Sequence, residues 1–113
     1  TGKPMREFLW SEDMADACVF IMENVDFSQL SKGKTEVRNC HINIGTGKEI
    51  SIHDLALLIK EITGYTGEIL FDSTKPDGTL RKLTDVTKLN SLGWRHTIEI
   101  DKGVEKMYQW YTR

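Results

Sequence analysis

Residues 40–72 read CHINIGTGKEISIHDLALLIKEITGYTGEILFD, and this stretch decides the fold class. Cys40–Gly45 alternates apolar and polar residues, which predicts a strand. Residues 51–63 follow with the pattern of an amphipathic helix, which starts at a Ser-x-x-Asp capping box and stops at Gly64. Glu68–Asp72 then predicts a second strand. A strand, a helix and a strand in succession indicate an α/β fold with a small parallel or mixed sheet.

The turn Gly45-Thr46-Gly47-Lys48 lies between the first predicted strand and the helix, where a phosphate cradle could form. It lacks the further glycine of a dinucleotide fingerprint and the Gly-Lys-Ser/Thr of a P-loop. The missing residues favour a plain connector over a phosphate-binding loop.

Three more helices are predicted, from Ser11 as N-cap to Val25, from Asp85 to Leu92, and from Asp101 to Tyr111. Asp26–Asn39 has no periodicity and is expected to be an exposed loop. Gly103 interrupts the last helix and predicts close backbone packing there. The residues expected to face the core are Met14, Cys18, Ile21, Met22 and Val25; Leu55, Leu58, Ile59 and Ile62; Val86, Leu89, Leu92 and Trp94; and Val104, Met107, Tyr108 and Tyr111.

The bulk composition bounds the function classes. The 113 residues carry a net charge of −2, so no overall field favours nucleic acid or an anionic membrane, and no apolar run could span a bilayer. Cys18 and Cys40 are too few for a disulfide framework, which predicts a reducing, cytoplasmic location. The Cys40-His41 pair lacks the second pair of a zinc site. Because the chain starts at Thr1 in a loop-like segment, we expect residues 1–113 to be one domain cut from a longer protein.

A basic loop, Lys75-Pro76-Asp77-Gly78-Thr79-Leu80-Arg81-Lys82, follows the second predicted strand. Pro76 removes a backbone donor and Asp77-Gly78 favours a turn, so this segment cannot be a helix or a central strand. Three cations held on a turn suit a ligand that carries phosphate groups. The alternative is a solvated loop with ordinary surface charges.

Two sets of motifs resemble a known family. The first resembles segments of the substrate domain of extended short-chain dehydrogenase/reductases that act on nucleotide sugars: Pro4-Met5-Arg6-Glu7-Phe8-Leu9 with Glu12-Asp13-Met14-Ala15-Asp16-Ala17, and His41-Ile42-Asn43-Ile44-Gly45-Thr46-Gly47. The second closely resembles the GDP-L-fucose synthase family within that group: Phe71 to Thr79 with Arg81-Lys82 and Asp85-Val86-Thr87, followed by Leu92-Gly93-Trp94 and Tyr108-Gln109-Trp110.

The resemblance implies that the chain is the C-terminal, GDP-sugar-binding domain of such an enzyme. Members of the family epimerise C3 and C5 of GDP-4-keto-6-deoxy-D-mannose and reduce C4 with NADPH, giving GDP-L-fucose. The chain has no Gly-x-x-Gly-x-x-Gly and no Tyr-x-x-x-Lys motif, so we expect NADP and the catalytic residues on a missing N-terminal Rossmann domain. We therefore expect a fragment that is inactive alone, a homodimeric parent, and self-association of the fragment through an exposed interdomain face.

Five residues receive substrate-binding roles from the resemblance. Arg6 matches the arginine that contacts the GDP diphosphate, and Lys82, with Asp77, matches loop residues that contact the nucleotide. Arg81 and Lys75 either contact the ligand or remain solvated. The chain departs from the family at Leu80, where proline is usual, and at Trp10, where histidine is usual. Neither departure changes Arg6 or Lys82.

Two other functions stay open. The chain could belong to a related epimerase or dehydratase that uses another nucleotide. It could also be a non-catalytic binding domain whose basic loop meets a protein carboxylate.

Overall fold

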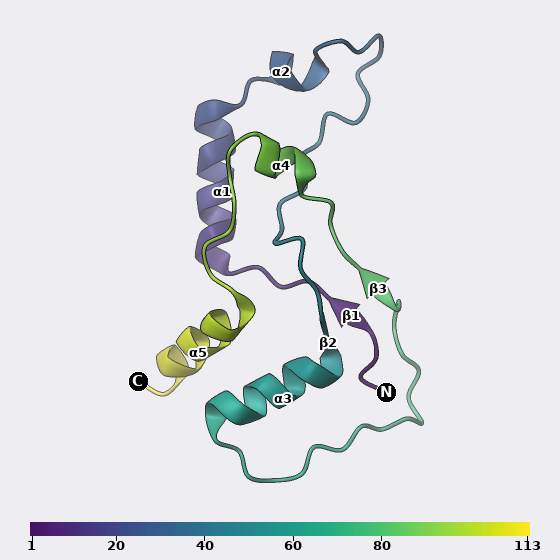
Figure 1. The fold of residues 1–113 in the computed structure, drawn as a ribbon, viewed down its shortest axis with the longest axis vertical. Helices are drawn as coiled ribbons and strands as arrows, with labels where there is room; N and C mark the ends of the chain where they lie inside the picture. The colour runs from purple at the N-terminus through teal and green to yellow at the C-terminus, as the bar shows by residue number, and fades with distance from the viewer.

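The computed structural model describes all 113 residues, Thr1 to Arg113. Figure 1 shows helices and long loops arranged around a very small sheet. The elements in chain order are β1 (Met5–Arg6), α1 (Ser11–Asn24), α2 (Phe27–Ser31), β2 (Ile50–Ser51), α3 (Ile52–Thr63), β3 (Arg81–Lys82), α4 (Thr87–Ser91) and α5 (Ile100–Tyr111).

The sheet has the strand order β2-β1-β3. β1 pairs antiparallel with β2, matching Arg6 with Ile50, and parallel with β3, matching Arg6 with Lys82. The predicted mixed α/β class is therefore confirmed, but the predicted strands are wrong. Cys40–Gly45 and Glu68–Asp72 are irregular, because neither segment finds a partner backbone to pair with. The strands come instead from Met5–Arg6, from the two residues directly before α3, and from the last two residues of the basic loop.

The sequence places all four predicted helices well, although the N-cap of α1 is Trp10 and not Ser11. Ser51 caps α3 by accepting a hydrogen bond from the Asp54 N–H at 2.9 Å, and Gly64 ends it in the left-handed conformation at φ 69°. The helices α4 and α5 begin and end within two residues of the predicted bounds. Inside the predicted loop 26–39, however, residues 27–31 form α2, which starts with a capping box between Asp26 and Gln29.

The small core lies between α1, α4 and the segment that follows α4. Ala17 and Leu89 are fully buried, and Trp94 packs on them as predicted, with its indole N–H donating to Asp16 at 2.8 Å. The predicted core stripe of α1 is only partly right: Ile21 packs on the core, but Met14, Cys18 and Met22 are exposed, because the helix turns Asp13 and Ala17 inward. The close backbone packing predicted at Gly103 is also wrong: a methyl group there would meet only side-chain atoms of Trp10 and Ile98, at ordinary contact distances of 3.7 and 3.8 Å.

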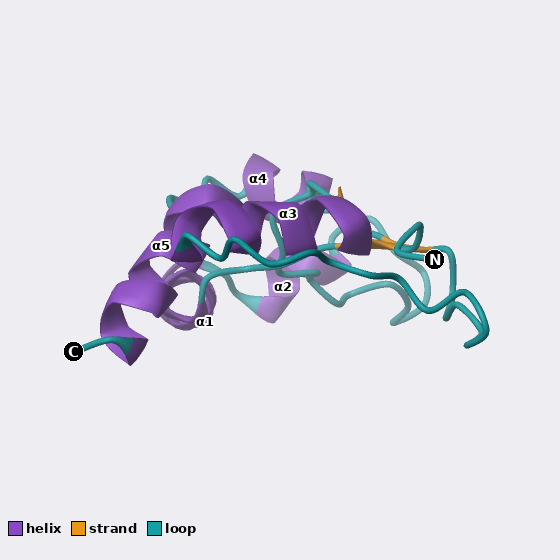
Figure 2. Cartoon of the chain, turned by 90° about the horizontal axis from the view of Figure 1, so that it is seen from below, coloured by secondary structure: helices purple, strands orange, loops and turns teal.

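The molecule is a thin slab of 56 × 36 × 16 Å, and Figure 2 shows this flatness from below. Its radius of gyration is 17.9 Å, whereas a compact chain of this length would have about 13 Å. The helices α3 and α5 pack against each other (Figure 1), yet Ile59, Met107 and Tyr111 on their predicted core stripes remain exposed. Much of the apolar surface of the helices is therefore open.

Candidate functional site

The parallel pair β1·β3 places two of the predicted site residues next to each other. Arg6 and Lys82 are register partners, so their side chains leave the same face of the sheet. The Arg6 guanidinium reaches over the basic loop, where its Nη1 donates to the Thr79 carbonyl at 2.8 Å and to the Met5 carbonyl at 2.6 Å. A methyl group at Gly78 would lie 3.2 Å from Nη2, so glycine lets the guanidinium approach the loop backbone.

Arg6 and Lys82 both keep unused donors. The N–H groups on Nε and Nη2 of Arg6 make no hydrogen bond in the chain, because both of its bonds start from Nη1. Lys82 is exposed and forms no ion pair or hydrogen bond through its ammonium group, and the same holds for Lys75 further along the loop. Two neighbouring cations with free N–H donors can bind an anion that has several oxygen atoms.

The remaining predicted residues already have partners inside the chain. Arg81 precedes Lys82 in β3 and leaves the other face of the sheet, where its Nε lies 2.8 Å from a Glu49 carboxylate oxygen. The Asp77 carboxylate accepts from the amino group of Thr1 at 2.8 Å and from the Thr1 hydroxyl.

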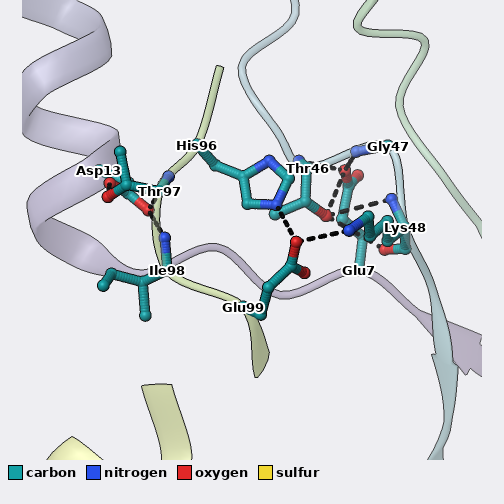
Figure 3. Close-up of polar contacts among 9 residues, drawn as sticks. All are labelled: Glu7, Asp13, Thr46, Gly47, Lys48, His96, Thr97, Ile98 and Glu99. Atoms are coloured by element: carbon teal, nitrogen blue, oxygen red, sulfur yellow. Dashed lines mark hydrogen bonds and ion pairs between the residues drawn. The ribbon is translucent and has the colours of Figure 1, made fainter. Parts of the chain in front are cut away.

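Glu7 forms a carboxylate clamp that the sequence reasoning missed. One oxygen accepts from the Thr46 N–H and the Gly47 N–H, both at 2.7 Å (Figure 3). The other oxygen accepts from the Thr84 N–H at 3.0 Å and from the Thr84 hydroxyl at 2.6 Å. The Gly-rich turn thus cradles an anion, but the anion is a side chain of the same chain. Gly45 is buried beside this clamp, and a Cβ there would collide with Thr84 and Glu7.

Burial raises the pKa of Glu7, but the hydrogen bonds from Thr84, Gly47 and Thr46 outweigh it and lower the pKa overall. Glu7 is therefore ionised at neutral pH. A signal for this clamp was present in the sequence: an acidic residue follows the site arginine, and a Gly-Thr-Gly turn supplies N–H groups without any phosphate-loop motif.

Asp13 forms a second clamp at the base of α1. Its side chain, only 5% exposed, accepts from the N–H groups of Thr97 at 3.0 Å and Ile98 at 2.9 Å on one oxygen. The Thr97 hydroxyl donates to the other oxygen at 2.7 Å. Burial raises the pKa of Asp13, but these bonds and the nearby His96 lower it overall.

A charged bridge lies between the two clamps in Figure 3. The Glu99 carboxylate accepts a hydrogen bond from the ammonium group of Lys48, the residue after Gly47 of the Glu7 clamp. The same carboxylate oxygen lies 3.2 Å from Nε2 of His96, the residue before Thr97 of the Asp13 clamp. The hydrogen bond from Lys48 is the main cause that lowers the pKa of Glu99. The bridge therefore lies between the two clamps, next to each of them along the chain: Lys48 directly follows Gly47, and His96 directly precedes Thr97.

An apolar groove of about 430 Å³ lies between α3, α5 and the segments 8–10 and 98–100. Arg6 and Lys82 do not line this groove, so the cationic pair and the apolar groove are separate surfaces. The residues along the groove include Phe8, Trp10, Ile59, Ile98, Ile100, Val104, Met107, Tyr108, Trp110 and Tyr111.

No group of three or more His, Cys, Asp or Glu side chains could hold a metal ion. No helix is long and apolar enough to cross a membrane.

Comparison with known proteins relates the chain to nucleotide-sugar enzymes. No protein-family model matches it. It is 46% identical to GDP-L-fucose synthase of Escherichia coli over 98% of the chain, and the match covers 34% of that enzyme. The relatives that match nearly the whole chain are thus GDP-L-fucose synthases, and its structural neighbours are GDP-sugar reductases of the extended short-chain dehydrogenase/reductase family. This confirms the resemblance inferred from the motifs.

Two solved structures support this relationship. A GDP-6-OMe-4-keto-L-xylo-heptose reductase from Campylobacter jejuni matches with a TM-score of 0.93 at 46% identity, over 99% of the chain and 32% of that enzyme. A GDP-mannoheptose C4 reductase from the same organism, solved with NADP bound, has a TM-score of 0.88 at 43% identity, over 100% of the chain and 33% of that enzyme. The chain thus spans about a third of the length of the relatives that it matches.

Proposed function

We propose that residues 1–113 are the C-terminal, GDP-sugar-binding domain of a GDP-L-fucose synthase. The observation that carries this proposal is the pairing of Arg6 with Lys82 against the basic loop, in a chain that is 46% identical to such an enzyme. The full enzyme would epimerise C3 and C5 of GDP-4-keto-6-deoxy-D-mannose and reduce its C4 ketone with NADPH.

In this proposal the cationic pair binds the diphosphate of the nucleotide sugar. The free donors of Arg6 fork onto phosphate oxygens, and Lys82 adds a point charge from the neighbouring strand. Asp77 lies on the same loop, where its carboxylate can accept from ribose hydroxyls or from guanine N–H groups. Lys75 adds positive charge to the loop, and Arg81 supports it through Glu49.

The residues present do not fit an NADP site. The Gly-Thr-Gly turn is the only phosphate-loop candidate of the sequence, and Glu7 occupies its Thr46 and Gly47 N–H groups. We therefore assign NADP and the reacting groups to residues outside these 113, in a Rossmann domain on the N-terminal side. We also place the enzyme in the cytoplasm, because Cys18 and Cys40 are free thiols.

A second candidate is a reductase of a GDP-4-keto-heptose. The heptose reductase of Campylobacter jejuni is as similar to the chain, at 46% identity, as the fucose synthase of Escherichia coli. Both candidates share the GDP-binding role and differ in the sugar.

Steady-state NADPH oxidation by the full-length enzyme tests the proposal. Turnover with GDP-4-keto-6-deoxy-D-mannose, and formation of GDP-L-fucose, are expected. Turnover with a GDP-4-keto-heptose alone would favour the second candidate. Turnover with neither substrate would contradict both.

A further inference from the structure

The scaffold that holds the cationic pair is slight. Each of the strands β1, β2 and β3 has two residues, so the ladder itself supplies few hydrogen bonds. A slip of one residue between β1 and β3 would turn Lys82 to the opposite face from Arg6. Something besides the ladder must therefore fix the register.

The Glu7 clamp lies where it can do this. Glu7 directly follows Arg6, and Thr84 is two residues beyond Lys82, so the two bonds from Thr84 tie the end of β1 to the end of β3. The bonds from Thr46 and Gly47 tie the same carboxylate to the segment that enters β2. One side chain thus joins the end of β1 to the segment before β2 and the segment after β3, through four bonds of 2.6 to 3.0 Å and a longer one of 3.4 Å from the Thr46 hydroxyl.

The clamp requires a carboxylate. Three of its five hydrogen bonds come from backbone N–H groups, which cannot reverse their direction, and these lie on both oxygens of Glu7. A glutamine would turn its NH₂ group toward at least one of these donors, whichever way the amide is flipped. A charge-neutral side chain of the same shape therefore cannot replace Glu7.

We infer that Glu7 is a positioning residue for nucleotide binding, which holds Arg6 and Lys82 side by side by clamping the ends of the three strands. The inference rests on the proposed GDP-binding role of that pair. Glu7 itself does not touch the ligand in this account. Its effect on affinity passes through the register of β1 and β3.

The test uses the full-length enzyme with Glu7→Gln and the matched control Glu23→Gln, because Glu23 is exposed on α1 and makes no hydrogen bond through its side chain. Calorimetric titration with GDP and with inorganic pyrophosphate is done at a temperature where circular dichroism shows each variant folded. Glu7→Gln should weaken both ligands by about tenfold, comparable to losing one charge-assisted contact. KM for the GDP-sugar should rise while kcat at saturation stays unchanged, and Glu23→Gln should match the wild type.

Thr84 provides a second, milder test that does not depend on how Glu7→Gln folds. Thr84→Val removes the hydroxyl that donates to Glu7 and keeps the shape, whereas Thr84→Ser keeps the hydroxyl. We expect the valine variant to bind GDP more weakly and the serine variant to bind it normally. A purely structural role would lower the thermal midpoint and leave the affinity of the folded protein unchanged in every variant, which would overturn the inference.

The outcomes also separate this inference from the proposed function. If Arg6→Ala and Lys82→Ala leave GDP affinity unchanged, the binding site itself is wrong. If those two variants weaken binding but folded Glu7→Gln and Thr84→Val do not, the site stands and the positioning role of Glu7 is refuted.

Discussion

The Asp13 clamp makes a sharp prediction, because its two oxygens meet different kinds of donor. One oxygen accepts from two backbone N–H groups, and the other only from the Thr97 hydroxyl. In Asp13→Asn the amide oxygen can keep both hydrogen bonds from the backbone N–H groups. The amide NH₂ group can donate to the Thr97 hydroxyl, because that hydroxyl can rotate and accept. The variant should therefore keep all three hydrogen bonds and lose only the charge, at a cost of about 1 kcal/mol.

Asp13→Ala has no such solution. It leaves the N–H groups of Thr97 and Ile98 without their acceptor. Each buried donor that loses its acceptor costs about 1–3 kcal/mol of stability. The expected loss is therefore about 2–6 kcal/mol, a large part of the stability of a small domain. The same reasoning predicts that Glu7→Gln costs more than Asp13→Asn, because both oxygens of Glu7 face backbone N–H groups.

Native-state hydrogen exchange of the Thr97 and Ile98 amides measures these costs locally. Since 1.4 kcal/mol corresponds to a factor of ten, protection should fall by about tenfold or less in Asp13→Asn and by at least about thirtyfold in Asp13→Ala. Glu23→Gln serves as the control. Equal losses of protection in the asparagine and alanine variants would refute the assignment of donors to the two oxygens.

Three further predictions follow from other parts of the fold. Gly103→Ala should stabilise the protein by about 0.5–1 kcal/mol, because a methyl group fits at this position of α5 and alanine favours a helix. A lower thermal midpoint of the variant would show that the methyl group does not fit. The free energy of unfolding should fall as the pH drops below about 4, because the pKa values of Glu7 and Asp13 are lowered in the folded state. The stability that these two carboxylates contribute is complete above their unfolded pKa and is lost as the pH falls through their folded pKa. The double variant Glu7→Gln with Asp13→Asn should flatten this slope in acid denaturation curves, and an unchanged slope would contradict the prediction. The isolated 113-residue chain should self-associate through exposed side chains such as Met22, Trp110 and Tyr111, and light scattering that shows a monodisperse monomer at high concentration would refute this.

The sequence predicted the elements that depend on local signals. Ser51 and Gly64 gave both ends of α3, and the position of Trp94 after a helix stop indicated its packing on the core. The α/β class was also right, although it was inferred from two segments, Cys40–Gly45 and Glu68–Asp72, that form no strand. Local patterns sufficed wherever the neighbouring residues in the chain supply the stabilising contacts.

The sequence failed where long-range contacts decide the structure. Cys40–Gly45 alternates like a strand, but strand pairing requires a partner, and β1 pairs instead with the short segments at 50–51 and 81–82. The buried side of α1 was also missed, because Asp13 turns inward to meet Thr97 and Ile98, more than eighty positions along the chain. Arg6 and Lys82 were singled out by motif, but their adjacency depends on a parallel pairing that no local pattern encodes.

Arg6 and Lys82 are proposed to bind the diphosphate of a GDP-sugar together. Calorimetric titration of the full-length enzyme with GDP tests this proposal most directly, using Arg6→Ala, Lys82→Ala and the control Lys32→Ala, since Lys32 is exposed and makes no ion pair. We expect GDP to bind more tightly than UDP or dTDP, and each site variant to weaken GDP binding about ten- to a hundredfold, whereas the control should bind GDP like the wild type. Unchanged GDP affinity in both site variants would contradict the proposal.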